Sequence, residues 1–369
     1  MPTTSRPAWL EIDLNAISKN IGAIQNFVGK QTDIMAIVKA NAYGHGLISA
    51  SKAALKGGAK TLGVALPQEG LQLREAGIQA PILILGPILP PDARTLIHNN
   101  LSAVISNTES LQALAKAAKA KNTQAQIHLK VDTGMGRIGC TSAEGLELIH
   151  QIQQTSHIYL EGIMSHIAWE NLEDHDKIHT QIQHFQSFLQ QCAPIQPHWR
   201  HIANSATTLQ FPHAHYDLVR VGLLTYGLPP LNTPLQLTPA LSLKAQITQI
   251  RDLMPGQTLS YGGTFTLTRP SRIALIPLGY ADGYNRHLSN RAQVLVHNTR
   301  CPVVGTICMD LTLIDVTDVP QTKLGDEVIL LGASQSDQIT PQDLAHWSNT
   351  IVHEIISHLS PRLPRHYLP

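Results

Sequence analysis

The chain has 369 residues and a formal net charge of +1, and only 14% of its residues are charged. A chain of this length exceeds one ordinary hydrophobic core and predicts two domains. The near-neutral charge gives no global attraction to nucleic acid or to anionic lipid, so we expect neither as a partner. Because soluble proteins typically have about 25% charged residues, this composition favours a surface partly covered by another subunit.

The sequence shows no sign of export or of a membrane span. Residues 1–10 lack a basic segment followed by an apolar run. No stretch approaches the roughly 20 apolar residues that cross a bilayer. The four cysteines form no C-x-x-C pair, so neither a zinc site nor a disulfide framework is indicated. We therefore expect a cytoplasmic protein.

Short apolar runs alternate with amphipathic, helix-like stretches from the start to about residue 235. Continuous apolarity is typical of parallel strands buried on both faces. The runs are Ile34–Val38, Leu62–Ala65, Ile82–Leu85, Ala103–Ile105, Ile127–Val131, Ile158–Met164, His201–Ala203 and Leu218–Val221. The clearest helical stretches are Asn15–Val28, Thr108–Lys121 and Ser142–Gln154. Eight strands followed by helices favour a (β/α)8 TIM-like barrel over residues 1–235, although a doubly wound open sheet has the same periodicity.

The pattern changes after Pro229 and Pro230. From about residue 238 short β-rich runs are separated by turn pairs such as Pro255-Gly256 and Gly325-Asp326. The runs are Leu241–Ile250, Arg272–Pro277, Gln293–Val296, Leu311–Val316 and Glu327–Leu331. We therefore predict a mainly-β C-terminal domain over residues 236–369, which makes the whole chain an α/β protein.

A lysine stands at the C-terminal end of the first predicted barrel strand, in the string IMAIVKANAYGHG over residues 34–46. Parallel barrels keep their active sites at this end. A poorly solvated lysine holds more free amine, which Schiff-base formation requires. A lone lysine there is more often one whose amine simply reaches solvent. The whole string, however, resembles the lysine signature of the alanine racemases, which are fold-type III enzymes dependent on pyridoxal 5′-phosphate (PLP).

The resemblance covers essentially the whole chain and implies a PLP-bound, homodimeric enzyme that interconverts L-alanine and D-alanine. By this resemblance Lys39 binds PLP. Residues 129–139, LKVDTGMGRIG, resemble a second family signature. That match implies that Arg137 contacts the phenolic oxygen of PLP and the substrate carboxylate, which suits its fork of donors. Lys130 matches a position that is often carbamylated, and the carbamate would hold Arg137. An unmodified lysine is the alternative.

Further PLP contacts follow from the same resemblance. They are Tyr43, His166, Asn204, Ser205, Arg220, Gly222, Leu223 and His353. Loops after the last two strands of a barrel are its usual phosphate site. For His166 the resemblance implies a place in a hydrogen-bond relay that leads to the catalytic tyrosine. Arg220 is placed against the pyridine nitrogen. An arginine can only donate there, so it disfavours nitrogen protonation and weakens the electron sink.

Racemisation through a planar carbanion needs proton carriers on both faces of the α-carbon. Residues 259–265, LSYGGTF, resemble the segment that carries the second base. The match makes Lys39 one catalytic base and Tyr261 of the partner subunit the other. Residues 279–284 and 305–310 resemble loops that the β domain lends across the dimer. The same resemblance implies that, in these loops, Tyr280 narrows the entrance of the active site and Met309 contacts the substrate. The expected role of the enzyme is to supply D-alanine for peptidoglycan.

One residue departs from the family pattern. His353 stands where a tyrosine is usual near the phosphate, so serine could be accepted as well as alanine. The string HEIISH over residues 353–358 has one residue too many for the H-E-x-x-H zinc helix, and we expect no metal.

Two other classes remain open at this point. A PLP-dependent decarboxylase of the same architecture would use a cysteine loop from its partner, which Cys308 could provide. A non-catalytic PLP carrier keeps the barrel and its lysine but lacks the β domain, so the matches at Tyr261, Tyr280 and Met309 argue against it.

Overall fold

The computed structural model describes residues 6–169 and 174–369. The chain divides into two compact units. The barrel unit contains Asn15–Ala42 and Leu47–Thr238. The β unit contains the residues up to Leu14, the short stretch Tyr43–Gly46, and Pro239–Pro369.

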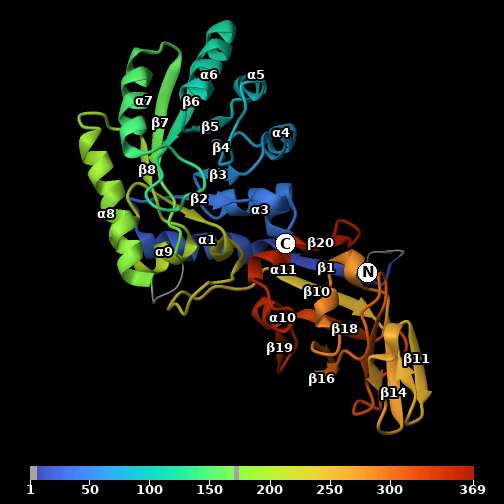
Figure 1. Cartoon of the computed structure of the whole chain (residues 1–369). Coiled ribbons are helices and arrows are strands. Elements are labelled where there is room, and N and C mark those ends of the chain that lie inside the picture. The colour runs from blue at the N-terminus through green and yellow to red at the C-terminus, as the bar shows by residue number, and fades with distance from the viewer. Residues whose placement is uncertain (1–5, 170–173) are drawn as a thin grey trace. The chain divides into compact units, whose positions relative to one another are not determined.

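Eight parallel strands form the centre of the barrel unit, in the order β8-β7-β6-β5-β4-β3-β2-β9 (Figure 1). Their bounds are β2 (Asp33–Ile37), β3 (Thr61–Val64), β4 (Ile82–Ile84), β5 (Ser102–Ile105), β6 (Ala125–Lys130), β7 (Ile158–Met164), β8 (Trp199–His201) and β9 (Leu218–Val221). Most of their side chains are buried, as expected for strands covered on both faces. Each of the eight predicted runs overlaps a strand, but the run His201–Ala203 shares only His201 with β8, which begins two residues earlier.

Hydrogen bonds also join the two outer strands of this sheet. The Arg220 amide donates to the Ala203 carbonyl at 3.1 Å, and the Asp217 amide donates to the Arg200 carbonyl at 3.2 Å. The Arg200 guanidinium binds the Asp217 carboxylate beside them. The sheet is thus nearly closed, which confirms the TIM-like barrel and excludes the open sheet.

Helices connect the barrel strands and bury their apolar faces (Figure 1). They are α1 (Leu14–Val28), α2 (Lys39–Tyr43), α3 (Leu47–Lys56), α4 (Pro67–Glu75), α5 (Asp92–His98), α6 (Thr108–Lys121), α7 (Ser142–Gln154), α8 (His175–Gln191), α9 (Ser205–Gln210), η2 (Pro212–Ala214) and η3 (Leu223–Tyr226). Caps define several of them: the Asn107 side chain accepts from the Ser110 amide at the start of α6. The segment labelled α2 is left-handed rather than an ordinary helix.

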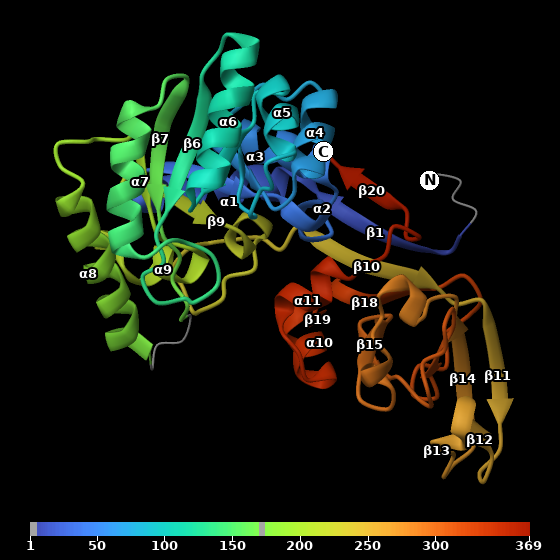
Figure 2. The same ribbon diagram turned by 45° about the horizontal axis from the view of Figure 1, so that its top comes forward.

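The β unit contains a seven-stranded, a three-stranded and a two-stranded sheet (Figure 2). Its strands are β1 (Ala8–Asp13), β10 (Leu241–Gln246), β11 (Gln249–Leu253), β12 (Thr258–Leu259), β13 (Phe265–Thr266), β14 (Ser271–Ile276), β15 (Gln293–Val296), β16 (Thr299–Pro302), β17 (Thr312–Asp315), β18 (Glu327–Ala333), β19 (Gln338–Ile339) and β20 (Arg365–Leu368). Its helices are η4 (Tyr261–Gly263), η5 (Tyr280–Asp282), η6 (Arg286–Leu288), α10 (Pro341–Ser348) and α11 (Val352–Ser357). The predicted mainly-β character is confirmed.

Two features of the β unit differ from the sequence-based expectation. The run Leu241–Ile250 is not one strand but parts of β10 and β11, which belong to different sheets. The break falls at Ile247 and Thr248, whose amides donate to Asp326 and Leu275 respectively. Strand β1, which the sequence did not predict, pairs antiparallel with β10 and parallel with β20.

Candidate active site

The carboxyl ends of the parallel barrel strands bring four of the predicted site residues to one rim. Lys39 follows β2 after a single residue, and Lys130 is the last residue of β6. His166 lies two residues beyond β7, and Arg220 lies on β9. Lys130 and Arg220 are buried, whereas Lys39 and His166 are half-buried.

The cationic side chains of this rim, together with Arg137, act on one another electrostatically. Burial and then the charge of Arg137 lower the pKa of Lys39, with Glu69 opposing them. Burial, followed by the charges of Arg220 and Arg137, lowers the pKa of Lys130 to about 8. Burial and the charges of all four cations place the pKa of His166 well below its ordinary value, so this imidazole is neutral at pH 7. The rim is therefore a strongly cationic site.

A tight loop after β6 carries Arg137. The Asp132 carboxylate accepts the amides of Gly134, Met135 and Gly136, each at 2.8 Å. Burial opposes ionisation of Asp132, but these backbone donors outweigh it and lower the pKa of the carboxyl. The loop thus holds an ionised carboxylate beside Lys130 and presents the Arg137 side chain, which is exposed.

Arg220 is the centre of a buried hydrogen-bond network. Its Nη2 lies 2.8 Å from His166 Nδ1 and also donates to the carbonyls of Ser165 and Ile202, at 2.9 and 3.0 Å. Because a guanidinium cannot accept, His166 Nδ1 must be the acceptor, and Nε2 carries the proton of this neutral ring. Burial lowers the pKa of Arg220 to about 9, so the guanidinium remains charged at pH 7.

The other half of this network consists of residues that no sequence motif indicated. Arg220 Nη1 lies 2.9 Å from His201 Nδ1, His201 Nε2 lies 2.8 Å from His128 Nδ1, and His128 Nε2 lies 3.1 Å from a Glu161 carboxylate oxygen. Ser102 donates to the same oxygen at 2.7 Å. Burial places the pKa of His201 well below its ordinary value and also lowers that of His128, although Glu161 opposes the latter. Two neutral imidazoles therefore link a buried arginine to a buried carboxylate.

Four of the predicted PLP contacts, Asn204, Ser205, Gly222 and Leu223, follow β8 and β9. Asn204 caps α9 by accepting the Thr207 amide at 2.9 Å. The Ser205 hydroxyl accepts the Gly222 amide at 3.0 Å. Leu223 is buried and begins η3 directly after Gly222. The structure thus brings Ser205 and Gly222 into direct contact.

The remaining predicted residues belong to the β unit. The rings of Tyr43 and His353 lie 5.9 Å apart between centroids. Tyr261 stands between β12 and β13, and its side chain is 74% exposed. Tyr280 and Met309 are 41% and 54% exposed. Three large side chains of the predicted site are therefore available for contact with another surface.

Hydrogen bonds couple the two loops that carry Tyr280 and Met309. The Tyr280 amide donates to the Cys308 carbonyl and the Ala281 amide to the Met309 carbonyl, both at 3.0 Å. Asp282, which is fully buried, accepts two bonds from Arg6, at 2.5 and 2.7 Å. Arg362 lies 3.5 Å from the same carboxylate and also binds Asp310 at 2.6 Å. The sequence analysis gave Asp282 no role.

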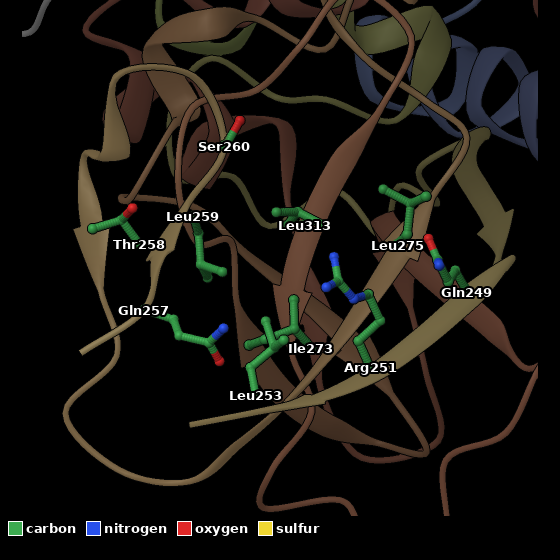
Figure 3. Close-up of a pocket in the computed structure, with 10 residues that line it drawn as sticks. All are labelled: Gln249, Arg251, Leu253, Gln257, Thr258, Leu259, Ser260, Ile273, Leu275 and Leu313. Carbon is green, nitrogen blue, oxygen red and sulfur yellow. The ribbon is translucent and has the colours of Figure 1, made fainter. Parts of the chain in front are cut away.

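A pocket of about 180 Å³ lies in the β unit, lined by residues of β11, β12, β14 and β17 (Figure 3). Leu253, Ile273 and Leu313 form part of its apolar wall, and Ser260, the neighbour of Tyr261, lies at its edge.

Across the residues that the structure describes, no group of three His, Cys, Asp or Glu side chains is placed to hold a metal ion. Nor does any described helix combine the length and apolarity that crossing a membrane requires.

Comparison with known proteins agrees with this architecture. Residues 12–230 match the family model "Alanine racemase, N-terminal domain", and residues 240–367 match "Alanine racemase, C-terminal domain". An alanine racemase from Symbiobacterium thermophilum is 42% identical over 98% of this chain and 97% of its own length.

Solved structures extend the likeness to the fold. An alanine racemase from a D-cycloserine-producing Streptomyces lavendulae superposes with a TM-score of 0.94 at 36% identity, covering 99% of this chain and 98% of that one. A histidine racemase from Leuconostoc mesenteroides subsp. sake superposes with a TM-score of 0.91 at 29% identity, covering 100% of this chain and 99% of that one.

A nearly closed barrel, a mainly-β domain and these matches define an amino-acid racemase. The chain belongs to the alanine racemase family. The resemblance stated from the sequence is thereby confirmed.

Proposed function

We propose that the chain is a PLP-dependent alanine racemase that acts as a cytoplasmic homodimer and supplies D-alanine for peptidoglycan. Lys39 and Tyr261 of the partner subunit are the two bases. The observation that carries the proposal is the set of four cations that act together on His166 at the barrel rim. Their mutual repulsion favours an anionic occupant, and the names of the relatives indicate the substrate.

The residues at the rim fit PLP. Its phosphate and phenolic oxygen are anionic, which matches a donor set of two lysines and two arginines. Ser205 and Gly222 would hold the phosphate beside α9, and Arg220 would donate to the ring nitrogen. When bound, PLP supplies an aldehyde that reacts with amines and a ring that withdraws electrons from the substrate α-carbon.

The residues of the chain would move the proton. Lys39 has a lowered pKa, so a larger fraction of its amine is free to take a proton on one face of the α-carbon. The hydroxyl of Tyr261 of the partner subunit would serve the other face. His166 is neutral and carries its proton on Nε2, so it can donate to a phenolate oxygen. Arg220 holds that imidazole in the required tautomer.

The exposure of Tyr261, Tyr280 and Met309 supports the dimer in this proposal. An aromatic side chain that is 74% exposed at a hairpin tip contributes little to the stability of its own subunit. Such side chains are enriched in interfaces, where an apolar ring and a polar hydroxyl both find partners.

The test mixes two inactive variants, Lys39→Ala and Tyr261→Phe, and follows D-alanine formation from L-alanine with carbon dioxide release as a control. If each site combines residues of two subunits, a heterodimer contains one intact site and one doubly defective site. Random reassortment then restores about one quarter of wild-type activity. Carbon dioxide in place of D-alanine would establish the decarboxylase instead. No recovery from the mixture would show that the two bases do not come from different subunits.

A broader racemase is the second candidate, and His353 favours it. Its ring lies beside Tyr43 in the β unit, at the position where the family usually has a tyrosine. The histidine racemase among the structural relatives acts, by its name, on a larger side chain than alanine. Acceptance of serine alongside alanine would follow from a pocket altered at this residue.

A further inference from the structure

A left-handed turn follows Lys39 directly. Ala40, Asn41, Ala42 and Tyr43 have φ angles of 52°, 55°, 55° and 52°, and none of them is a glycine. Residues other than glycine rarely adopt this conformation because Cβ approaches the following carbonyl oxygen. Four such residues in succession persist only when the surrounding structure holds them.

Several hydrogen bonds hold this turn. The Ala42 amide donates to the Val38 carbonyl at 2.8 Å, the Leu47 amide donates to the Asn41 side chain at 2.8 Å, and His45 Nδ1 lies 3.0 Å from the Tyr43 carbonyl. A shorter bond comes from outside the turn: the Ala40 amide donates to Glu69 Oε1 at 2.6 Å. Glu69 comes from α4, so the amide next to Lys39 is held by a carboxylate 29 residues along the chain.

The other oxygen of Glu69 is also engaged. Oε2 accepts the amides of Ala65 and Leu66, at 2.8 and 3.1 Å, where the chain passes from β3 into α4. Glu69 is the third residue of α4, and its side chain reaches back to the amides just before the helix, as the acidic residue of a capping box does. Strands β2 and β3 are neighbours. One carboxylate therefore ties the ends of two adjacent strands together.

Glu69 also acts on the charge of Lys39. Burial and the charge of Arg137 favour the neutral amine, whereas Glu69 favours the ammonium. The Glu69 side chain thus binds the backbone amide that follows Lys39, and its negative charge opposes part of the effect of Arg137 on the Lys39 amine.

We propose that Glu69 is a positioning residue for Lys39. Its carboxylate holds the left-handed turn against the end of β3 and places a negative charge near the amine of Lys39. This inference rests on the role proposed for Lys39 as a catalytic base.

The test uses the full-length chain freed of PLP and two readouts that need no turnover. One is amide hydrogen exchange at Ala40. The other is the pH at which Lys39 becomes half-modified by formaldehyde and cyanoborohydride, followed by peptide mapping. The matched control is Glu144→Gln, because Glu144 fills the same capping position of α7, where it accepts the Thr141 amide.

Three variants separate the two roles. In Glu69→Gln the loss of charge-assisted hydrogen bonds accelerates exchange at Ala40 roughly tenfold or more, and half-modification of Lys39 moves roughly half a unit to lower pH. Glu69→Asp keeps the charge but is one methylene shorter, so exchange accelerates while the modification pH stays near that of the unchanged chain. Glu144→Gln changes neither readout.

Equal behaviour of Glu69→Gln and Glu144→Gln in both readouts would overturn the proposal and reduce Glu69 to an ordinary helix cap. Because neither readout involves PLP or turnover, failure of the D-alanine assay would remove the proposed function and leave this result standing. Conversely, if the Glu69 variants behaved like Glu144→Gln, the positioning role would be lost and the proposed function would stand.

Discussion

The buried carboxylate of Asp282 offers a quantitative test of how the β unit holds its loops. Asp282→Asn keeps the size of the side chain and an acceptor for the Gly279 amide, which donates to Asp282 at 3.1 Å. It removes the charge that faces Arg6 and Arg362. Arg6 would then lose its charge-assisted pair of bonds and keep an uncharged amide oxygen, its bond to the Pro277 carbonyl and its longer contact with the Arg362 carbonyl.

The magnitude follows from the exposure of the partners. Removing one member of a buried ion pair costs about 3–5 kcal/mol when the other charge stays buried. The Arg6 and Arg362 side chains are 23% and 45% exposed, so water can solvate both after the change. We therefore expect the free energy of unfolding to fall by about 2 kcal/mol. KM for alanine should rise as well, because η5 carries both Asp282 and Tyr280.

Urea unfolding of the complete chain measures the loss, and Asp318→Asn is the matched control. Asp318 binds Arg269 at 2.6 Å, but the two side chains are 73% and 52% exposed. Water screens a pair so exposed, so we expect its loss to change the unfolding free energy very little. If both variants lost the same stability, burial would not be what makes the Asp282 network strong, and the reasoning would fail.

Two further predictions concern pH and specificity. Lys130 has a pKa of about 8 in the folded chain and about 10.4 in the unfolded chain. Between these pH values the unfolded chain binds more protons than the folded one. The free energy of unfolding therefore rises with pH over this window, by up to about 3 kcal/mol. Lys130→Met lacks this titration, so the unfolding free energy of the PLP-free chain minus that of Lys130→Met should rise with pH over this window. A difference that stays constant would contradict the burial of the amine. His353→Tyr should lower the ratio of kcat/KM for L-serine to that for L-alanine by about tenfold; an unchanged ratio would dismiss His353 as a specificity residue.

Local signals explain the elements that the sequence predicted well. The bounds of α6 and α7 coincide with the predicted helices because Asn107 and Thr141 cap their starts with side-chain oxygens. The eight barrel strands were recognisable because strands buried on both faces are continuously apolar. Lys39 and Arg137 could be proposed because each stands in a string that resembles a family signature, and Arg220 was proposed from the resemblance of the whole chain.

Features that depend on strand register could not be read from the sequence. Ile127 pairs with Leu160 and His128 with Gly162, so Glu161 is an extra residue in β7 at an irregularity of the ladder. A Cβ at position 162 would lie 2.3 Å from His128 Nδ1, so only glycine leaves room for this ring. No local pattern announces such a contact. Glu161, a charged residue within an otherwise apolar strand, was the signal in the sequence that could have pointed to this network.

The same limitation applies to the long-range partners of β1 and Glu69. The run Ala8–Asp13 is too short to predict its own pairing, and its partners β10 and β20 lie more than 200 residues further along the chain. Glu69 resembles any acidic residue in the first turn of a helix. Its contact with Ala40 depends on the adjacency of β2 and β3, which only the folded barrel provides.

The placement of β1 between β10 and β20 has a consequence for synthesis on the ribosome. Strand β1 can pair with β10 only once residues 241–246 have been translated, and with β20 only once residues 365–368 have followed. Before each partner is made, the corresponding edge of β1 is open, and an open edge favours pairing with foreign strands. The nascent chain therefore carries a strand with at least one open edge until close to termination, and chaperone demand should persist over that period.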